Sequence, residues 1–140
     1  MGNWTLNDIS ENLRDIELVM LMTHTQAGGI AGRPMSNIQD VKYHGDTFFL
    51  TSDRTRMVAD IERNRKVALS YCGPGKPTIF ITVQGEAELV RDRQAFKAHW
   101  REDLARWFPG GLDTPHLILI KVHASRVHYW DGESEGEVEV

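Results

Sequence analysis

The chain has 140 residues, a length that fits one domain able to bury a core without disulfides or a structural metal. Its 16 basic and 20 acidic side chains give a net charge of −4 without a basic stripe, which argues against general nucleic-acid binding. Cys72 is the only cysteine, so a disulfide framework within one chain is excluded, and no apolar run is long enough for a membrane helix. The first residues lack the pattern of a secretion signal, and we therefore expect a cytoplasmic protein.

Helix and strand signals alternate along the chain. Thr5 and Asp8 have the spacing of a capping box ahead of apolar residues at helical intervals. Gly85 interrupts a strand of period-two alternation, which indicates a bulge or a close approach to the backbone. In chain order the expected elements are a helix from about residue 6, strands over 18–25, from Ile30 and around 48–51, a helix over 55–64, strands over 67–72 and 78–89, a long helix over 92–107, and closing strands over 117–122 and 126–130.

About six strands in short hairpins, with one small helix and one longer helix between them, predict a mainly β fold. We expect a six-stranded antiparallel β-barrel with flanking helices, because a doubly wound sheet needs more helical crossovers. The turn at 44–46 should join the strand from Ile30 to the strand at 48–51 as a second hairpin. Residues 1–131 should form one domain, and the glutamate-rich residues 132–140 a solvated, mobile tail.

Hydroxyl and guanidinium groups gather where the strand at 48–51 leads into the next helix. Thr51, Ser52 and Thr55 supply hydroxyls, and Arg54 and Arg56 supply positive charge. The first turn of a helix leaves backbone N–H groups unpaired, so this segment is a candidate anion site. The alternative is that Thr55 is simply an N-cap and the arginines are solvated surface charge.

The order of several short motifs resembles the pyridoxamine 5'-phosphate oxidase-like general stress protein family, the FMN-binding split barrels. The motifs are Arg33-Pro34-Met35, Phe49-Leu50-Thr51-Ser52, the helix at 56–61, the alternating strand at 83–88, Trp107-Phe108-Pro109-Gly110-Gly111 and Tyr129-Trp130-Asp131. This resemblance implies a split β-barrel that forms a homodimer with FMN at the subunit interface.

The resemblance also assigns roles to residues. Arg33 would contact the phosphate, and Pro34 and Met35 would place their backbone against the ring system. Ser36 is a further candidate cofactor-binding residue. Leu50, Thr51 and Ser52 would line the ribityl and phosphate path, and Thr55 and Arg56 would complete the phosphate grip. Gln84 is a candidate ring contact, and Trp107 could wall the ring, from the same chain or from the partner. Met57 stands where the family often has lysine, so one phosphate cation is missing.

The remaining chemistry-bearing residues point to no other enzyme class. The six histidines have no metal-ligand spacing, so no metal site is expected, and Cys72 reads as a strand-end residue rather than a nucleophile. We therefore expect an FMN-dependent oxidoreductase acting on an unidentified small molecule. The alternatives are a non-catalytic flavin-binding or sensing module, a deazaflavin-dependent reductase on the same fold and, more distantly, haem handling. Pyridoxamine-phosphate oxidase activity itself is disfavoured because the chain ends without the basic segment of the true oxidases.

Overall fold

The computed structural model describes residues 3–37 and 42–140. Seven antiparallel strands and three α-helices make up most of the described chain, and this mainly β architecture confirms the predicted split barrel. The elements are α1 (Leu6–Leu13), β1 (Leu18–His24), β2 (Ile30–Ser36), β3 (Asp46–Ser52), α2 (Arg56–Arg63), β4 (Lys66–Cys72), β5 (Phe80–Val90), α3 (Arg93–His99), the short 3-10 helices η1 (Glu102–Arg106) and η2 (Gly111–Asp113), β6 (Leu117–Trp130) and β7 (Glu135–Val138). None of the helices in these two ranges has the length and apolar character needed to cross a membrane.

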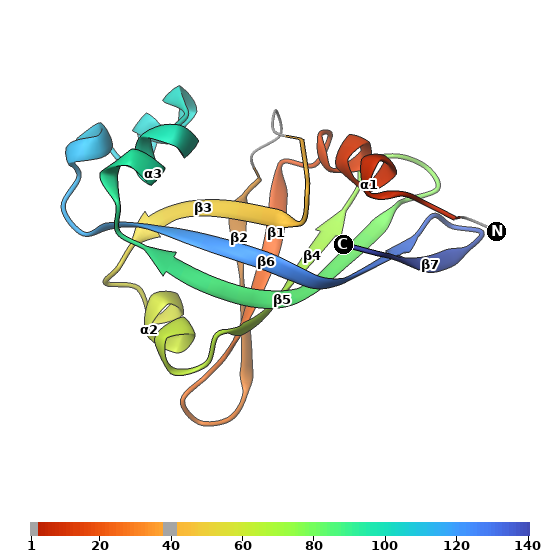
Figure 1. The fold of residues 1–140 in the computed structure, drawn as a ribbon, viewed down its shortest axis with the longest axis horizontal. Helices are drawn as coiled ribbons and strands as arrows, with labels where there is room; N and C mark the ends of the chain where they lie inside the picture. Colours follow the sequence, from red (N-terminus) through yellow and green to blue (C-terminus); the bar gives the residue numbers. More distant parts are fainter. Residues whose placement is uncertain (1–2, 38–41) are drawn as a thin grey trace.

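The strands form a single sheet in the order β2-β1-β4-β5-β6-β3, and β7 adds to the second half of β6. Figure 1 shows α2 beneath the sheet and α3 at the end opposite β7. Side chains on one face of the strands point into the barrel and are fully buried, because a period-two pattern places every second residue on the same face. Apolar side chains of α1 and α2 complete this interior, whereas α3 packs on a smaller cluster around Leu50, Leu117 and Leu119.

The local signals at both helix starts are confirmed. Thr5 and Asp8 form the reciprocal capping box, and the Thr55 hydroxyl accepts the Val58 N–H at 3.2 Å as the N-cap of α2. Gly85 marks a shift of register between β5 and β6, as its position within the strand predicted.

The predicted second hairpin is wrong. Among the described residues, β2 pairs only with β1, and β3 pairs with β6, which lies about 70 residues farther along the chain. Short-range turn signals at 44–46 suggested a local pairing, but β3 gains a seven-residue ladder with β6 instead. The two strands that were expected to be adjacent therefore stand at opposite edges of the sheet order.

The predicted long helix over 92–107 is also wrong. α3 ends at His99, the Trp100 backbone is extended (φ −72°, ψ 139°), and a short 3-10 helix follows. Phe96, Trp100 and Leu104 nevertheless pack into the same cluster around Leu50. These residues therefore have helical spacing because they share one apolar cluster, not because they belong to one continuous helix.

The carboxy-terminal segment contains a strand where a mobile tail was expected. Residues 135–138 form β7, which brings the number of strands to seven. Val138 is buried in the barrel core, and Gly136 lies so close to the Tyr129 ring that a Cβ would come within 2.9 Å of its hydroxyl. Glu135 and Glu137 face outward and alternate with Gly136 and Val138, which face inward. This period-two pattern is in the sequence, but the acidic composition of the segment suggested a tail instead of a strand. The two closing strands expected at 117–122 and 126–130 are likewise one continuous strand, β6.

Candidate functional site

A cleft of about 480 Å³ lies between the strands β2 and β3 and the segment that follows α3. One wall is formed by residues 34–37 and 48–51, and the other by residues of 99–108. Leu18 of β1 lies at the same opening. Three stretches that are distant in the sequence therefore meet at one hollow.

The cleft brings together half of the residues that the sequence assigned to a flavin site. These are Pro34, Met35, Ser36, Leu50, Thr51 and Trp107. The wall from β2 and β3 is mostly apolar, and Phe48 and Phe49 add aromatic surface to it. Such a wall suits a flat ring system, which needs an apolar slot with a few fixed polar contacts.

The second wall carries titratable side chains that sequence reasoning missed. His99 stacks on Phe48 with ring centroids 3.7 Å apart and an interplanar angle of 18°. Arg101 and Asp103 also line this wall, with 3.8 Å between the guanidinium Nε and a carboxylate oxygen. A helix continued through residue 107 would have spread these side chains around its surface, so no sequence signal placed them together.

The environment of His99 favours the neutral imidazole. Burial lowers the pKa of this histidine below its ordinary value, and the positive charge of Lys121 on β6 lowers it further. At neutral pH the wall therefore presents an uncharged ring beside the Arg101–Asp103 pair.

Trp107 lies on the rim of the cleft in the same chain as the other lining residues. Its side chain is 63% exposed, and the Arg106 guanidinium carbon lies 5.2 Å from the ring centroid. An exposed tryptophan at the mouth of an apolar cleft has surface to offer to a ligand or to a second protein.

Of the residues predicted to bind the phosphate, Ser52, Thr55 and Arg56 lie outside the cleft, next to its end at Thr51. Thr51 lines the cleft, and Ser52 and Thr55 follow it toward the start of α2. The Ser52 hydroxyl accepts the Arg54 N–H at 3.2 Å. Arg54 and Arg56 are exposed, and neither is in an ion pair with any other residue in the described ranges. Their guanidinium groups are available to an anion at this end.

Arg33 does not line the cleft and is occupied in a buried network. Its Nη1 donates to the Thr23 hydroxyl at 2.8 Å, and that hydroxyl donates to the Asp60 carboxylate at 3.0 Å. Asp60 is 1% exposed and also accepts a bond of 2.6 Å from Arg63. Arg33 therefore ties the β1–β2 hairpin to α2, a role that its sequence context did not suggest.

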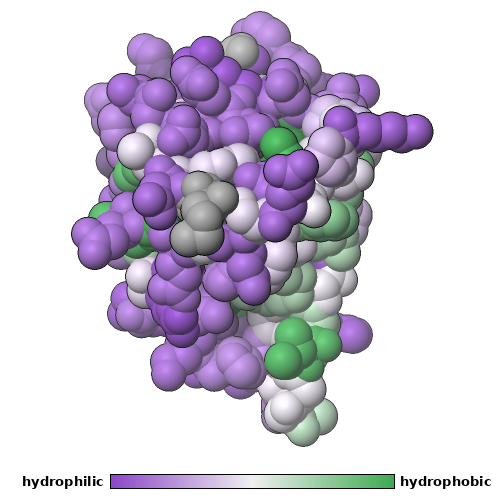
Figure 2. Space-filling view, turned by 90° about the vertical axis from the view of Figure 1, so that its right-hand side faces the viewer, coloured by the Kyte–Doolittle hydropathy of each residue, from purple (hydrophilic) through white to green (hydrophobic). Residues whose placement is uncertain are grey.

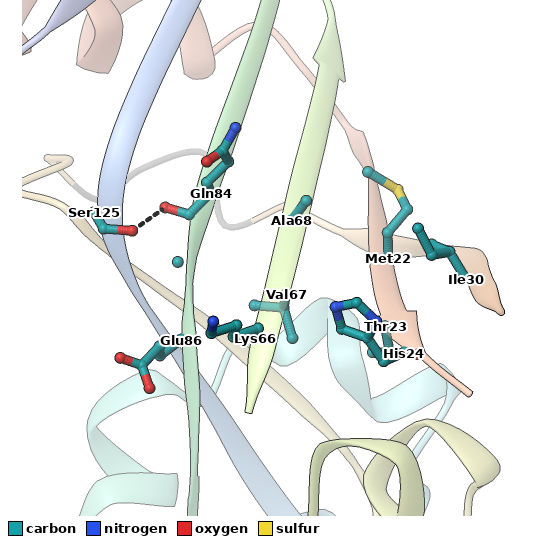
Figure 3. A pocket seen from close by; sticks show the side chains of 11 residues that line it. Met22, Thr23, His24, Ile30, Lys66, Val67, Ala68, Gln84, Glu86 and Ser125 are labelled. Atoms are coloured by element: carbon teal, nitrogen blue, oxygen red, sulfur yellow. Dashed lines mark hydrogen bonds between the residues drawn. The ribbon is translucent and has the colours of Figure 1, made fainter. Parts of the chain in front are cut away.

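Two further predicted residues lie elsewhere. Met57 is buried in the main core, which explains why an apolar side chain is accommodated at this position of α2. Gln84 lies in a separate groove of about 370 Å³ on the outer face of the sheet (Figure 3). Figure 3 shows Met22 and Ile30 at one side of this groove, and Gln84 at the other, with its carbonyl accepting a bond from Ser125 at 3.1 Å.

Metal-ligating side chains do not gather anywhere in residues 3–37 and 42–140 in a group of three or more that could hold an ion. The described cleft offers an apolar wall, the His99 imidazole and the Arg101–Asp103 pair, and the exposed Arg54 and Arg56 lie beyond Thr51.

Comparison with known proteins places the chain in a family. The family model described as "Pyridoxamine 5'-phosphate oxidase like" matches residues 5–140. Protein bli-3 of Neurospora crassa is 23% identical over an alignment of 133 residues, and the match covers 89% of this chain. The chain spans 63% of the length of that relative.

Solved structures share the fold at low sequence identity. A Clostridium acetobutylicum protein related to general stress protein 26 of B. subtilis has a TM-score of 0.83 and 19% identity, covering 96% of this chain and 94% of that one. The general stress FMN/FAD binding protein of Xanthomonas citri has a TM-score of 0.78 and 24% identity, covering 92% and 89%. A heme binding protein of Mycobacterium smegmatis has a TM-score of 0.72 and 14% identity, covering all of this chain and 63% of that one. With the family match spanning almost its whole length, this chain belongs to the pyridoxamine 5'-phosphate oxidase-like family.

Proposed function

We propose that this protein is an FMN-binding oxidoreductase of the general stress type, acting on a small molecule. The observation that carries the proposal is the cleft, which gathers residues 34–36, Leu50, Thr51 and Trp107 from three distant stretches. The description of the Xanthomonas citri neighbour as FMN/FAD binding supports it.

The residues present fit FMN at both of its ends. Pro34, Met35 and Leu50 offer apolar surface to the ring system, and Thr51 offers a hydroxyl along the path from the cleft toward α2. Arg54 and Arg56 at the start of α2 would hold the phosphate. Bound FMN supplies the electron-transfer chemistry, so the chain needs only to hold it, orient it and limit solvent access.

Replacing Arg54 and Arg56 together by alanine should weaken FMN binding by about tenfold to a hundredfold, because the pair would lose about 1.5–3 kcal/mol in total of charge-assisted hydrogen bonding to the phosphate. Riboflavin, which has no phosphate, should bind the parent chain and the double variant equally. Flavin fluorescence titrations with both ligands measure the two affinities.

Lys76→Ala, an exposed cation in the β4–β5 turn, is the matched control and should leave both affinities unchanged. Equal FMN affinity of the double variant and the parent chain would show that the phosphate lies elsewhere.

We also propose that the protein is a homodimer formed through the outer face of β2, β1, β4, β5 and β6. Five of the seven large hydrophobic side chains that are exposed in the described ranges point outward there, namely Leu18, Met20, Ile30, Phe80 and Trp130. Figure 2 shows hydrophobic residues gathered along one edge of the molecule toward the tip of the β1–β2 hairpin. Leu18, Pro34 and Ser36 belong to this face and also line the cleft, so a partner seated on it would complete the site.

The reactivity of Cys72 toward a maleimide tests this interface without any substitution. Cys72 is exposed on the outer face next to Phe80, and it is the only cysteine of the chain. We expect a maleimide to label it at least tenfold more slowly above the dimer dissociation constant than below it, since a buried thiol is shielded from reagent. Sedimentation at the same concentrations gives the mass. A monomer at all concentrations with a uniformly reactive Cys72 would contradict the proposed interface.

The ability to exchange electrons distinguishes an enzyme from a flavin-storage or sensing module. Anaerobic addition of NADH or NADPH to the FMN-loaded protein should bleach the visible flavin bands if the chain is an oxidoreductase. Stable colour with both nucleotides would favour the non-catalytic alternative. The absorbance spectrum of the protein as purified also separates flavin from deazaflavin and from haem, because each has its own bands.

A further inference from the structure

His99 stands out among the residues that line the cleft because the proposed binding of FMN gives it no role. It is the last residue of α3, stacks on Phe48, and lines the cleft opposite the apolar wall from β2 and β3. The stacking fixes the plane of the imidazole against one wall, so its ring is held at the cleft rather than left to turn freely in solvent.

Among the described residues that line the cleft, His99 is the only histidine. The other ionisable side chains of the lining are Arg101 and Asp103, which form an ion pair with 3.8 Å between the guanidinium Nε and a carboxylate oxygen. Lys121 of β6 is held near Asp46, with 3.8 Å between the ammonium nitrogen and a carboxylate oxygen. Only an imidazole has an ordinary pKa between about pH 5 and pH 8.

We propose that His99 takes up a proton when flavin bound in the cleft is reduced, and so couples proton uptake to electron uptake. This inference rests on the proposed function. The two electrons come from an added reductant and leave the flavin with a negative charge once it has taken one proton from solvent. A negative charge in the same hollow favours the imidazolium, so a second proton from solvent adds to the free ring nitrogen of His99.

The direction of the effect follows from the neutral state of His99 in the free chain. Burial and Lys121 disfavour the imidazolium, and the isoalloxazine ring of oxidised FMN is uncharged, so the His99 ring stays neutral beside it. The negative charge of the reduced ring system raises the pKa of this imidazole. Lowering the pH therefore favours the reduced form in the parent chain more than in a variant without the imidazole.

The pH dependence of the reduction potential of bound FMN counts the protons taken up. Between about pH 5 and pH 8, the parent chain should take up nearly two protons per two electrons over part of the range. His99→Gln and His99→Phe should take up about one, and the phenylalanine keeps the stacking on Phe48 without a titratable group. At the acidic end of this range, the ratio of the affinity for reduced FMN to the affinity for oxidised FMN should be on the order of tenfold lower in both variants than in the parent chain. His44→Gln, which alters an exposed histidine before β3, is the matched control and should behave like the parent.

The outcomes separate this inference from the function on which it depends. Parallel pH profiles for the parent and both His99 variants, with FMN bound normally, would overturn the role of His99 and leave the FMN site standing. Failure of the folded parent chain to bind FMN would overturn both. If His99→Gln took up only one proton but His99→Phe still took up two, the effect would come from packing against Phe48, and the proposal would be contradicted.

Discussion

Asp60→Ala is expected to lower the free energy of unfolding by about 3 kcal/mol, because it removes the acceptor of a buried network. The Asp60 carboxylate is 1% exposed and receives bonds from the Thr23 hydroxyl at 3.0 Å and from Arg63 at 2.6 Å. Arg33 reaches the same carboxylate at 3.8 Å. The substitution leaves the buried Thr23 hydroxyl without an acceptor and the partly buried Arg33 without its counter-charge.

Urea unfolding followed by circular dichroism measures this loss, with the slope of the transition checked for constancy. Asp113→Ala is the matched control, since it removes a carboxylate that is 80% exposed and pairs with Arg93 at 2.8 Å. An exposed pair contributes about 0–1 kcal/mol. Equal losses in the two variants would show that the Asp60 network does not hold the β1–β2 hairpin against α2.

Gly85→Ala should destabilise the barrel by about 3 kcal/mol, at the upper end of the cost of overpacking. A Cβ at this position would overlap the carbonyl oxygen of His123 on β6 and lie 3.0 Å from its carbon. Both groups belong to backbone in the centre of the sheet, where β5 and β6 share a ladder on each side of the bulge. The methyl group can be admitted only by parting the two strands, because no flexible side chain is there to move aside.

Thermal and urea unfolding of Gly85→Ala can be compared with Gly75→Ala in the β4–β5 turn. A Cβ at Gly75 has no neighbour nearer than 3.8 Å, so that substitution should be close to neutral. A Gly85→Ala protein as stable as the parent would mean that the close approach of β6 does not persist in solution.

Local signals in the sequence predicted the elements better than their pairing. The Thr5 capping box, the Thr55 cap and the Gly85 bulge depend on residues within a few positions, and all three are present. The partner of β3 was missed because its ladder with β6 joins positions about 70 residues apart in sequence, such as Phe49 and Ile120. No turn signal encodes such a pairing.

At the cleft, too, residues in short motifs were predicted, whereas contacts between distant parts of the chain were not. Residues 34–36, Leu50, Thr51 and Trp107 were selected through short motifs, and the fold gathers them. Arg33 belonged to the same motif, yet its guanidinium group is bound to the Thr23 hydroxyl and lies 3.8 Å from the buried Asp60 carboxylate. No short motif encodes these two partners, because both are distant from Arg33 in the sequence. His99 was missed because the break at Trp100 that brings it to the cleft has no glycine or proline to mark it.

An absorbance titration of the purified chain with FMN tests the central claim most directly. The account predicts that the folded protein takes up an equimolar amount of FMN, with the two visible flavin bands shifted from their positions in free FMN by the apolar wall of the cleft. A folded protein whose addition leaves the FMN spectrum unchanged, and which retains no FMN on dialysis, would contradict the assignment of the cleft as a flavin site.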